Sequence, residues 1–327
     1  MLGLSIDRAS GAVSRFPADS PLALSFVDQL YLVGGAYVSA SAAFTVTRST
    51  TKLAQDGAGH WHSFGPDVAA ITNLGLLLEP SATNVLRNAS AQGAVAGSPG
   101  TFPTYWGRFA GGGPTLSVAG HGTEAGLPYV DIRLSGLSTA VSGAAIHFEQ
   151  TNAAAAVQGE TWTGSAFVRL VGGSLSGLST MRLNIQESNS GGSGTNTNYG
   201  TDVRNQMSDQ WLRIQEVNEL RAATTNFVRV SLELAYTAGA AIDVTLRVSC
   251  PQLENGSVAT SPILSGTTAQ MRAADQIHLQ LPTFPCVVEL TYGSAVRQTL
   301  SADGGRLALE AEDLLRYDIV EIFATYQ

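Results

Sequence analysis

The chain has 327 residues, of which 44% are apolar and only 13% charged, with a formal net charge of −8. This length suits two or three domains with an ample core. Lys52 is the only lysine, so no basic stripe is available for phosphates and we expect no nucleic-acid partner. No apolar run approaches the length of a membrane span, and the N-terminus lacks the pattern of a signal peptide, so we expect no membrane insertion.

The two cysteines, Cys250 and Cys286, each lie in a strand-like apolar segment. Two scattered cysteines do not make a disulfide framework. We therefore expect both to be small buried side chains with free thiols.

Residues 1–88 contain short β-type runs at 22–26 and 31–33, and a run at 44–48 that alternates apolar and polar residues. No helical period persists, so we predict a β-rich N-terminal attachment region. Within it, His60-Trp61-His62 places two imidazoles on one face of a strand, a spacing that can hold a metal ion. Only Asp56 is nearby as a third ligand. We therefore expect an exposed turn with Trp61 packed inward, and His60 and His62 are weak metal candidates.

Residues 89–262 contain eight short apolar runs separated by Gly, Ser and Asn. Many of them alternate with period two, which predicts sheets with one face on a core and one face in water. Eight such strands predict a two-sheet jelly-roll sandwich. The expected strands lie at 115–118, 129–134, 145–149, 162–170, 181–186, 211–217, 227–234 and 242–249.

Residues 263–327 predict a small C-terminal β-domain, with strands at 277–281, 287–292, 297–301, 306–309 and 319–326. Gly304-Gly305 predicts a hairpin turn between two of them. Such a small domain buries little surface, so we expect it to lean on the sandwich or on copies of itself. The whole chain is thus predicted to be all-β, in three parts.

One stretch carries a family resemblance. Gly75-Leu-Leu-Leu-Glu79, followed by Thr83-Asn84-Val85-Leu86, resembles a segment of phage tail-fibre, tail-spike and head-fibre proteins, G-L-L-(I/L)-E-x-x-x-T-N-L. The residues leading to Trp106 are similar to the beginning of the lectin-like jelly roll of these proteins. Pro251-Gln-Leu-Glu-Asn-Gly256 and Arg272-Ala-Ala-Asp275 are similar to its end. The resemblance covers roughly residues 40–280.

This resemblance implies a virion structural protein, assembled in the host cytoplasm, whose jelly roll is like a carbohydrate-binding module. It implies that the N-terminal region binds other virion proteins and that the jelly roll binds host cell-surface polysaccharide. It also implies a homo-oligomer, most often a trimer, in which weak sugar contacts add up.

A sugar site needs an aromatic side chain that stacks on the ring and polar groups that hold the hydroxyls. Trp162 and Trp211 begin strand patterns and are assigned to the core, and Trp106 to the end of the sandwich. The polar segment 188–202 cannot bury apolar area, so we predict a surface loop. The candidate carbohydrate-binding residues therefore lie there: Tyr199, Asn196, Asn198 and Asp202.

Two further chemistries have weaker support. A structural calcium ion could be held by Glu124, Asp131 and Asp243, although no loop has an Asp-x-Asp-x-Asp pattern. The acidic residues are scattered one per strand, and no motif for nucleophilic catalysis or phosphate binding is present. We expect no catalytic residues and no cofactor, and leave the calcium open.

Two alternative functions stay open. A capsid, tail or baseplate component would use its jelly roll for contacts with other virion proteins alone. A polysaccharide depolymerase would need a pair of carboxylates that face a groove.

Overall fold

The computed structural model describes residues 5–6, 13–14, 16, 20–314 and 318–326. The described chain is all-β, as expected, and divides into two compact units. Unit 1 combines residues 1–81 with residues 272–327, and unit 2 is residues 82–271. The two end segments, expected as separate domains with boundaries at 88 and 262, are thus parts of one unit. The stretch before Ser20 lies largely outside the described residues.

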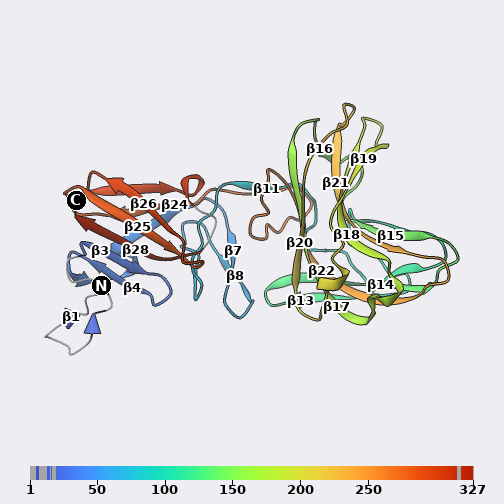
Figure 1. Cartoon of the computed structure of the whole chain (residues 1–327), viewed down its shortest axis with the longest axis horizontal. Helices are drawn as coiled ribbons and strands as arrows, with labels where there is room; N and C mark the ends of the chain where they lie inside the picture. Colours follow the sequence, from blue (N-terminus) through green and yellow to red (C-terminus); the bar gives the residue numbers. More distant parts are fainter. Residues whose placement is uncertain (1–4, 7–12, 15, 17–19, 315–317, 327) are drawn as a thin grey trace. The chain divides into compact units, whose positions relative to one another are not determined.

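In unit 1, strands from the two ends of the chain pair in the same sheets. Strand β3 (Leu22–Ser25) lies between β4 (Leu30–Val33) and β28 (Ile319–Tyr326). Strand β6 (Phe44–Thr47) pairs with β24 (Gln276–Gln280). Figure 1 shows these blue and orange-red strands side by side. The C-terminal segment is too short to bury a core alone, and the N-terminal segment supplies the missing surface.

The larger sheet of unit 1 has the order β26-β25-β28-β3-β4-β5, with β10 beside β28, and a smaller sheet has the order β27-β24-β6. The hairpin expected at Gly304-Gly305 is wrong, because this turn joins β26 to β27, which lie in different sheets. The described residues contain no helix that is long and apolar enough to cross a membrane. The other elements of unit 1 are β1 (Ser5–Ile6), β2 (Val13–Ser14), β5 (Ala36–Tyr37), α1 (Ala40–Ala43), β7 (Lys52–Gln55), β8 (Trp61–Phe64), β9 (Ile71–Thr72), β10 (Gly75–Leu76), β25 (Cys286–Tyr292), β26 (Arg297–Ala302), β27 (Arg306–Glu310) and the 3-10 turn Ala311–Asp313.

Unit 2 is the expected two-sheet antiparallel sandwich, and all eight expected strands are present in it. One sheet has the order β13-β14-β22-β17-β20, and the other has the order β12-β15-β21-β18-β19 with β16 beside β21. From β14 onward the chain crosses repeatedly between the two sheets, with β15–β16 and β18–β19 as consecutive strands of one sheet, which is jelly-roll-like connectivity. Figure 1 shows both sheets in green to orange. The strands are β11 (Ala82–Asn84), β12 (Gly107–Ala110), β13 (Thr115–Glu124), β14 (Leu127–Leu137), β15 (Ser142–His147), β16 (Ala154–Ala155), β17 (Thr161–Ser174), β18 (Thr180–Ser188), β19 (Gly194–Tyr199), β20 (Leu212–Glu219), β21 (Phe227–Tyr236), β22 (Ala241–Asn255) and β23 (Gln270–Arg272), with 3-10 turns at Leu175–Gly177 and Arg204–Gln206.

The core between the two sheets contains two of the three tryptophans of unit 2. Trp106 and Trp162 are 6% and 3% exposed and belong to the core. Trp211, expected in the core, lies just before β20 and is only half-buried, with the Arg169 guanidinium 5.5 Å from its ring centre. The strand that the sequence predicts from Trp211 therefore begins one residue later, at Leu212. Both cysteines are buried and free, as expected.

The segment 188–202, expected to be a surface loop, contains strand β19. This strand pairs with β18 from Asn184 to Ser188 and forms an edge of its sheet. An edge strand needs partners on one side only, and its two β-branched residues, Thr195 and Thr197, suit the extended backbone. Composition alone suggested a loop because the strand has no apolar face.

Candidate functional site

The outward side of the sheet that contains β18 and β21 is lined by polar side chains. Inward residues such as Leu183 and Leu232 fill the core, and the residues between them point the opposite way. The strand register aligns these outward residues in rows, of which one runs Gly107, His147, Ser231, Asn184 and Tyr199. We call this surface the polar face and define it by ten residues: His147, Arg182, Asn184, Gln186, Ser188, Thr197, Tyr199, Arg229, Ser231 and Glu233.

Long side chains on the polar face cover short ones. Asn184, Ser188 and Ser231 are only 3%, 1% and 5% exposed, although they point away from the core. They are flanked by half-buried side chains that include Gln186 and Glu233. The centre of the face is therefore shielded from bulk water, which strengthens polar contacts made there.

Several side chains of the polar face hold one another in place. Glu233 accepts hydrogen bonds from Arg182 Nη2 at 2.7 Å and from Asn184 Nδ2 at 2.6 Å. The Arg182 guanidinium also lies 4.0 Å from the ring centre of Tyr199, a cation–π contact. Because these side chains hold one another, a ligand that uses the face would not have to order them itself.

The polar face also holds buried polar atoms without a hydrogen-bond partner. In the described part of the chain there are nine such side-chain atoms, and four lie on this face or on β19 at its edge. Buried polar groups are almost always bonded to protein, water or ligand. These atoms therefore need water or a ligand rich in hydroxyl groups to complete their hydrogen bonds. The four atoms are His147 Nδ1, Asn184 Oδ1, Ser188 Oγ and Thr195 Oγ1.

His147 on the polar face has a shifted pKa, which should make the stability of unit 2 depend on pH. Burial, together with the nearby positive charge of Arg229, lowers the pKa of His147 to about 4. The imidazole is thus neutral in the folded chain at pH 7 and resists protonation on acidification. In the unfolded chain it would take up a proton near its ordinary pKa of about 6.5.

We expect this difference to destabilise unit 2 as the pH falls from 6.5 to 4, because over that window only the unfolded chain binds the proton. The free energy of unfolding should fall by about 2 kcal/mol. This is less than the full pKa difference would give, because the side chain is only partly buried. Urea unfolding followed by tryptophan fluorescence at pH 7 and pH 4 measures it. His147→Gln should remove this part of the pH dependence, and an unchanged slope would contradict the assignment.

Only one of the four predicted sugar-binding residues lies on the polar face. Tyr199 is 58% exposed there. Asn196 and Asn198 point to the other side of β19 and donate to Glu187 Oε1 at 2.7 and 3.3 Å. Their amides therefore hold the edge strand to the sheet and are already engaged.

Asp202, the fourth predicted residue, is bound within its own turn. Its carboxylate accepts from Arg204 Nε at 2.9 Å and from the Met181 backbone N–H at 3.0 Å. The Arg204 hydrogen bond is the main reason why the pKa of Asp202 falls to about 2. It is placed to shape the turn after β19, away from the polar face.

The weak metal candidates His60 and His62 lie beside one carboxylate. His62 Nε2 is 2.8 Å and His60 Nδ1 is 3.8 Å from Asp56 Oδ2, and both imidazoles are more than half exposed. Trp61 between them is half-buried. Across the described residues, no three His, Cys, Asp or Glu side chains come together in a way that could hold a metal ion.

The three acids considered for calcium bind arginines instead. Arg247 pairs with Glu124 at 3.0 Å and with Asp131 at 2.8 Å. Arg133 pairs with Asp243 at 2.8 Å. These pairs cross the outward side of the five-stranded sheet. Each carboxylate is thus neutralised by a guanidinium where a calcium ligand would face a cation site, so the three do not form one.

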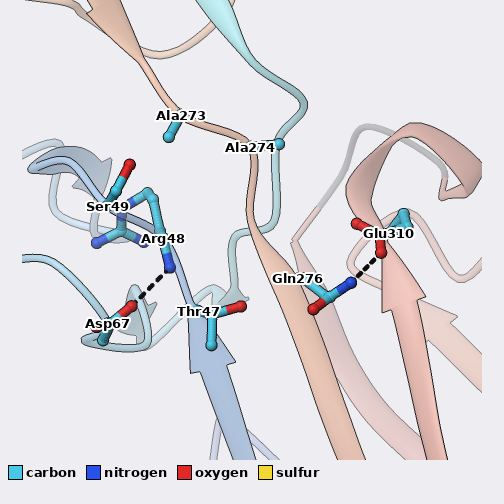
Figure 2. Close-up of a pocket in the computed structure, with 8 residues that line it drawn as sticks. All are labelled: Thr47, Arg48, Ser49, Asp67, Ala273, Ala274, Gln276 and Glu310. Carbon is cyan, nitrogen blue, oxygen red and sulfur yellow. Dashed lines mark hydrogen bonds between the residues drawn. The ribbon is translucent and has the colours of Figure 1, made fainter.

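A concavity of about 380 Å³ lies in unit 1 (Figure 2). Its polar groups bond to one another: the Arg48 backbone N–H donates to Asp67 Oδ1 at 2.9 Å, and Gln276 donates to Glu310. The Arg48 guanidinium is used inside the unit, 2.7 Å from Asp275. This pocket therefore offers a ligand fewer available hydrogen-bonding groups than the polar face does.

The fold and site together define an antiparallel β-sandwich protein with a structured polar sheet face. No protein-family model matches the sequence, and a comparison with curated proteins finds no match. Among solved structures, similarity is found to a carbohydrate-binding module of the β-sandwich superfamily, at 12% identity and a TM-score of 0.39. That match covers 71% of this chain and 84% of the module.

Phage proteins are also among the similar structures. The baseplate tripod of bacteriophage Tuc2009 is similar at 13% identity and a TM-score of 0.38, over 82% of this chain and 96% of that chain. The tailspike protein 4 of bacteriophage CBA120 is similar at 8% identity and a TM-score of 0.31, over 47% of this chain. The chain spans 20% of that tailspike chain, and 30% and 27% of two other solved chains that it matches.

Proposed function

We propose that this chain is a phage virion protein that binds host cell-surface polysaccharide through the polar face of unit 2, without catalysis. The observation that carries the proposal is the concentration of partnerless, buried polar atoms on one pre-ordered sheet face. The resemblance of the Gly75–Leu86 segment to tail and head fibres supports the virion assignment. A homo-oligomer, as that resemblance implies, would multiply weak sugar contacts.

The polar face has the parts that a sugar chain requires. Tyr199 on β19 and Phe109 on β12 are 58% and 56% exposed and lie on the two edge strands of the sheet. Four strand spacings separate these edges, a span of about 19 Å. Aromatic rings can stack on sugar rings at either edge, while side chains between them bond the hydroxyls.

Three acids of unit 2 that lie on strands or just beyond them are engaged by arginines. Arg87 binds Glu149, Arg182 binds Glu233 and Arg247 binds Asp131. A depolymerase would need two carboxylates facing a groove with one of them ready to take or give a proton. This engagement supports a binding role over hydrolysis.

A blocking substitution tests the proposal. Ala145 is a half-buried outward residue of β15, in the row of Phe109 and Glu233. Ala145→Trp should lower the affinity of the full chain for purified host surface polysaccharide by at least about tenfold, because the indole fills the face. Affinity electrophoresis in gels that contain the polysaccharide measures this loss.

Ser135→Trp is the matched control, since Ser135 is a half-buried outward residue on β14 in the other sheet. It should leave the affinity unchanged. Equal affinity of Ala145→Trp and the unchanged chain would place the site elsewhere, and loss of binding in Ser135→Trp alone would move it to the opposite sheet.

A further inference from the structure

We infer that the polar face selects an acidic polysaccharide and that Arg229 binds the carboxylate or phosphate group of its ligand. This inference rests on the proposed function, because it specifies the chemistry of the same face. It concerns a residue that none of the sequence patterns singled out.

Among the residues that the structure describes, Arg229 is a cation without an anionic partner. It lies on the central strand β21, opposite Gln186, and its Nε donates to Gln186 Oε1 at 2.6 Å. Within the described residues its two Nη atoms make no hydrogen bond and no carboxylate pairs with it. The bond from Nε fixes the plane of the guanidinium and leaves the Nη edge available. Two parallel N–H groups on that edge match the two oxygens of a carboxylate or phosphate.

The other charges of the polar face do not offset Arg229. Arg182 and Glu233 neutralise each other at 2.7 Å. Glu149, two residues beyond His147, is bound by Arg87 at 2.7 Å. Burial lowers the pKa of the Arg229 guanidinium, so its charge is held at a cost in a partly desolvated place. A ligand anion would relieve that cost, whereas a neutral sugar would not.

Buried polar atoms surround Arg229 on both neighbouring strands. On β18, the outward residues that flank Gln186 on the polar face are Asn184 and Ser188. They carry the partnerless Oδ1 and Oγ atoms. On β15, His147 pairs with Ser231, two residues from Arg229, and offers a partnerless Nδ1. An anion at Arg229 would thus place the hydroxyls of the same sugar near acceptors that have no other partner.

The test compares acidic and neutral polymers on the full chain. The carboxylate probe is polygalacturonate, its neutral counterpart is the fully methyl-esterified polymer, and the phosphate probe is poly(glycerol phosphate) teichoic acid. Host surface polysaccharide is used before and after chemical reduction of its carboxyl groups. We expect the unchanged chain to bind at least one anionic probe about tenfold or more tightly than the neutral forms. The two anionic probes distinguish a carboxylate from a phosphate ligand.

Arg229→Gln should abolish that preference, because the amide keeps a partner for Gln186 but carries no charge. Arg133→Gln, which removes an exposed arginine from the other sheet, should leave it intact. Equal binding of anionic and neutral forms, with Ala145→Trp weakening both, would overturn this inference and leave the proposed function standing. Absence of binding to every polymer, including the host polysaccharide, would overturn both.

Discussion

Asp275→Asn should lower the free energy of unfolding of unit 1 by about 3–5 kcal/mol, because it leaves two buried cations without their shared anion. Arg48 Nη1 lies 2.7 Å from Asp275 Oδ1, and Lys52 Nζ lies 2.6 Å from Asp275 Oδ2. All three side chains are fully buried. Asp275 also accepts the backbone N–H of Glu79 at 2.8 Å.

Glu79 does not compensate for the loss of Asp275. Its carboxylate already lies 3.2 Å from both Lys52 and Arg272, so the cluster contains three cations and two anions before the change. Burial lowers the pKa of Lys52, although Glu79 and Asp275 raise it. Without Asp275, we expect Lys52 to lose its proton more readily and Arg48 to remain as a buried unpaired charge.

Hydrogen exchange of peptides from β6 and β24 measures the stability of unit 1 separately from unit 2. Glu289→Gln is the control, because its pair with Arg297 also lies in unit 1 but is largely exposed, so its loss should change stability little. If both substitutions cost the same small amount, the buried cluster does not stabilise unit 1.

This buried cluster explains part of the family resemblance. Glu79 ends the Gly-Leu-Leu-Leu-Glu segment, and Arg272 and Asp275 delimit the later motif, so these two distant motifs meet in one ionic network. Gly75 is required because its φ is +132° and the Ile319 carbonyl oxygen lies 2.5 Å from where a Cβ would be. These motif residues shape the scaffold, and none of them lies on the polar face.

Asn84 has a comparable role in unit 2. Its Nδ2 donates to the carbonyl oxygens of Pro251 and Ile263, and its Oδ1 accepts from the backbone N–H of Leu253. It thereby joins the beginning of the sandwich to its end. The resemblance could predict the fold because its motifs consist of such buried contacts. For the same reason it carried no information about which surface binds a ligand.

The sandwich could be predicted because its strands alternate, as in Val228-Arg-Val-Ser-Leu-Glu-Leu234, and each alternation shows directly which residues face a core. The polar face could not be predicted, because it arises when outward residues of β15, β18 and β21 meet in register. His147 and Ser231 are far apart in the chain, and nothing local indicates that they pair. Tyr199 is a sequence candidate because it is aromatic in a polar segment, whereas Arg229, which we propose from the structure, resembles any solvated strand residue in the sequence.

The pairing of β3 with β28 was missed for a similar reason. Both strands are predicted from the sequence, but an alternating pattern does not show which strand pairs with which. Alternation alone therefore predicts separate early and late domains, although the C-terminal segment is too short to bury a core alone.

Glu187→Gln should destabilise unit 2 by about 4 kcal/mol, because its buried carboxylate accepts hydrogen bonds and has no counter-cation in the described part of the chain. The donors are the side chains of Asn196, Asn198 and Thr225 and the backbone N–H groups of Arg221 and Ala222. An amide in the same position presents its own N–H groups to some of these donors. Strand β19, and with it Tyr199, should then detach from the edge of the polar face.

The pH dependence gives this prediction a second readout. Burial raises the pKa of Glu187, but the hydrogen bonds from Asn196, Thr225 and the two backbone groups lower it more, so the net shift is downward. The stabilisation is therefore complete above the ordinary glutamate pKa and is lost as the pH falls through the depressed value.

Urea unfolding followed by tryptophan fluorescence reports mainly on unit 2, which holds three of the four tryptophans. The curves of the variant and the unchanged chain should converge at acid pH, whereas Glu219→Gln, at an exposed position of β20, should change stability by less than about 0.5 kcal/mol at any pH. A constant difference between the Glu187→Gln variant and the unchanged chain from pH 7 to pH 2 would show that the ionised carboxylate is not what holds β19.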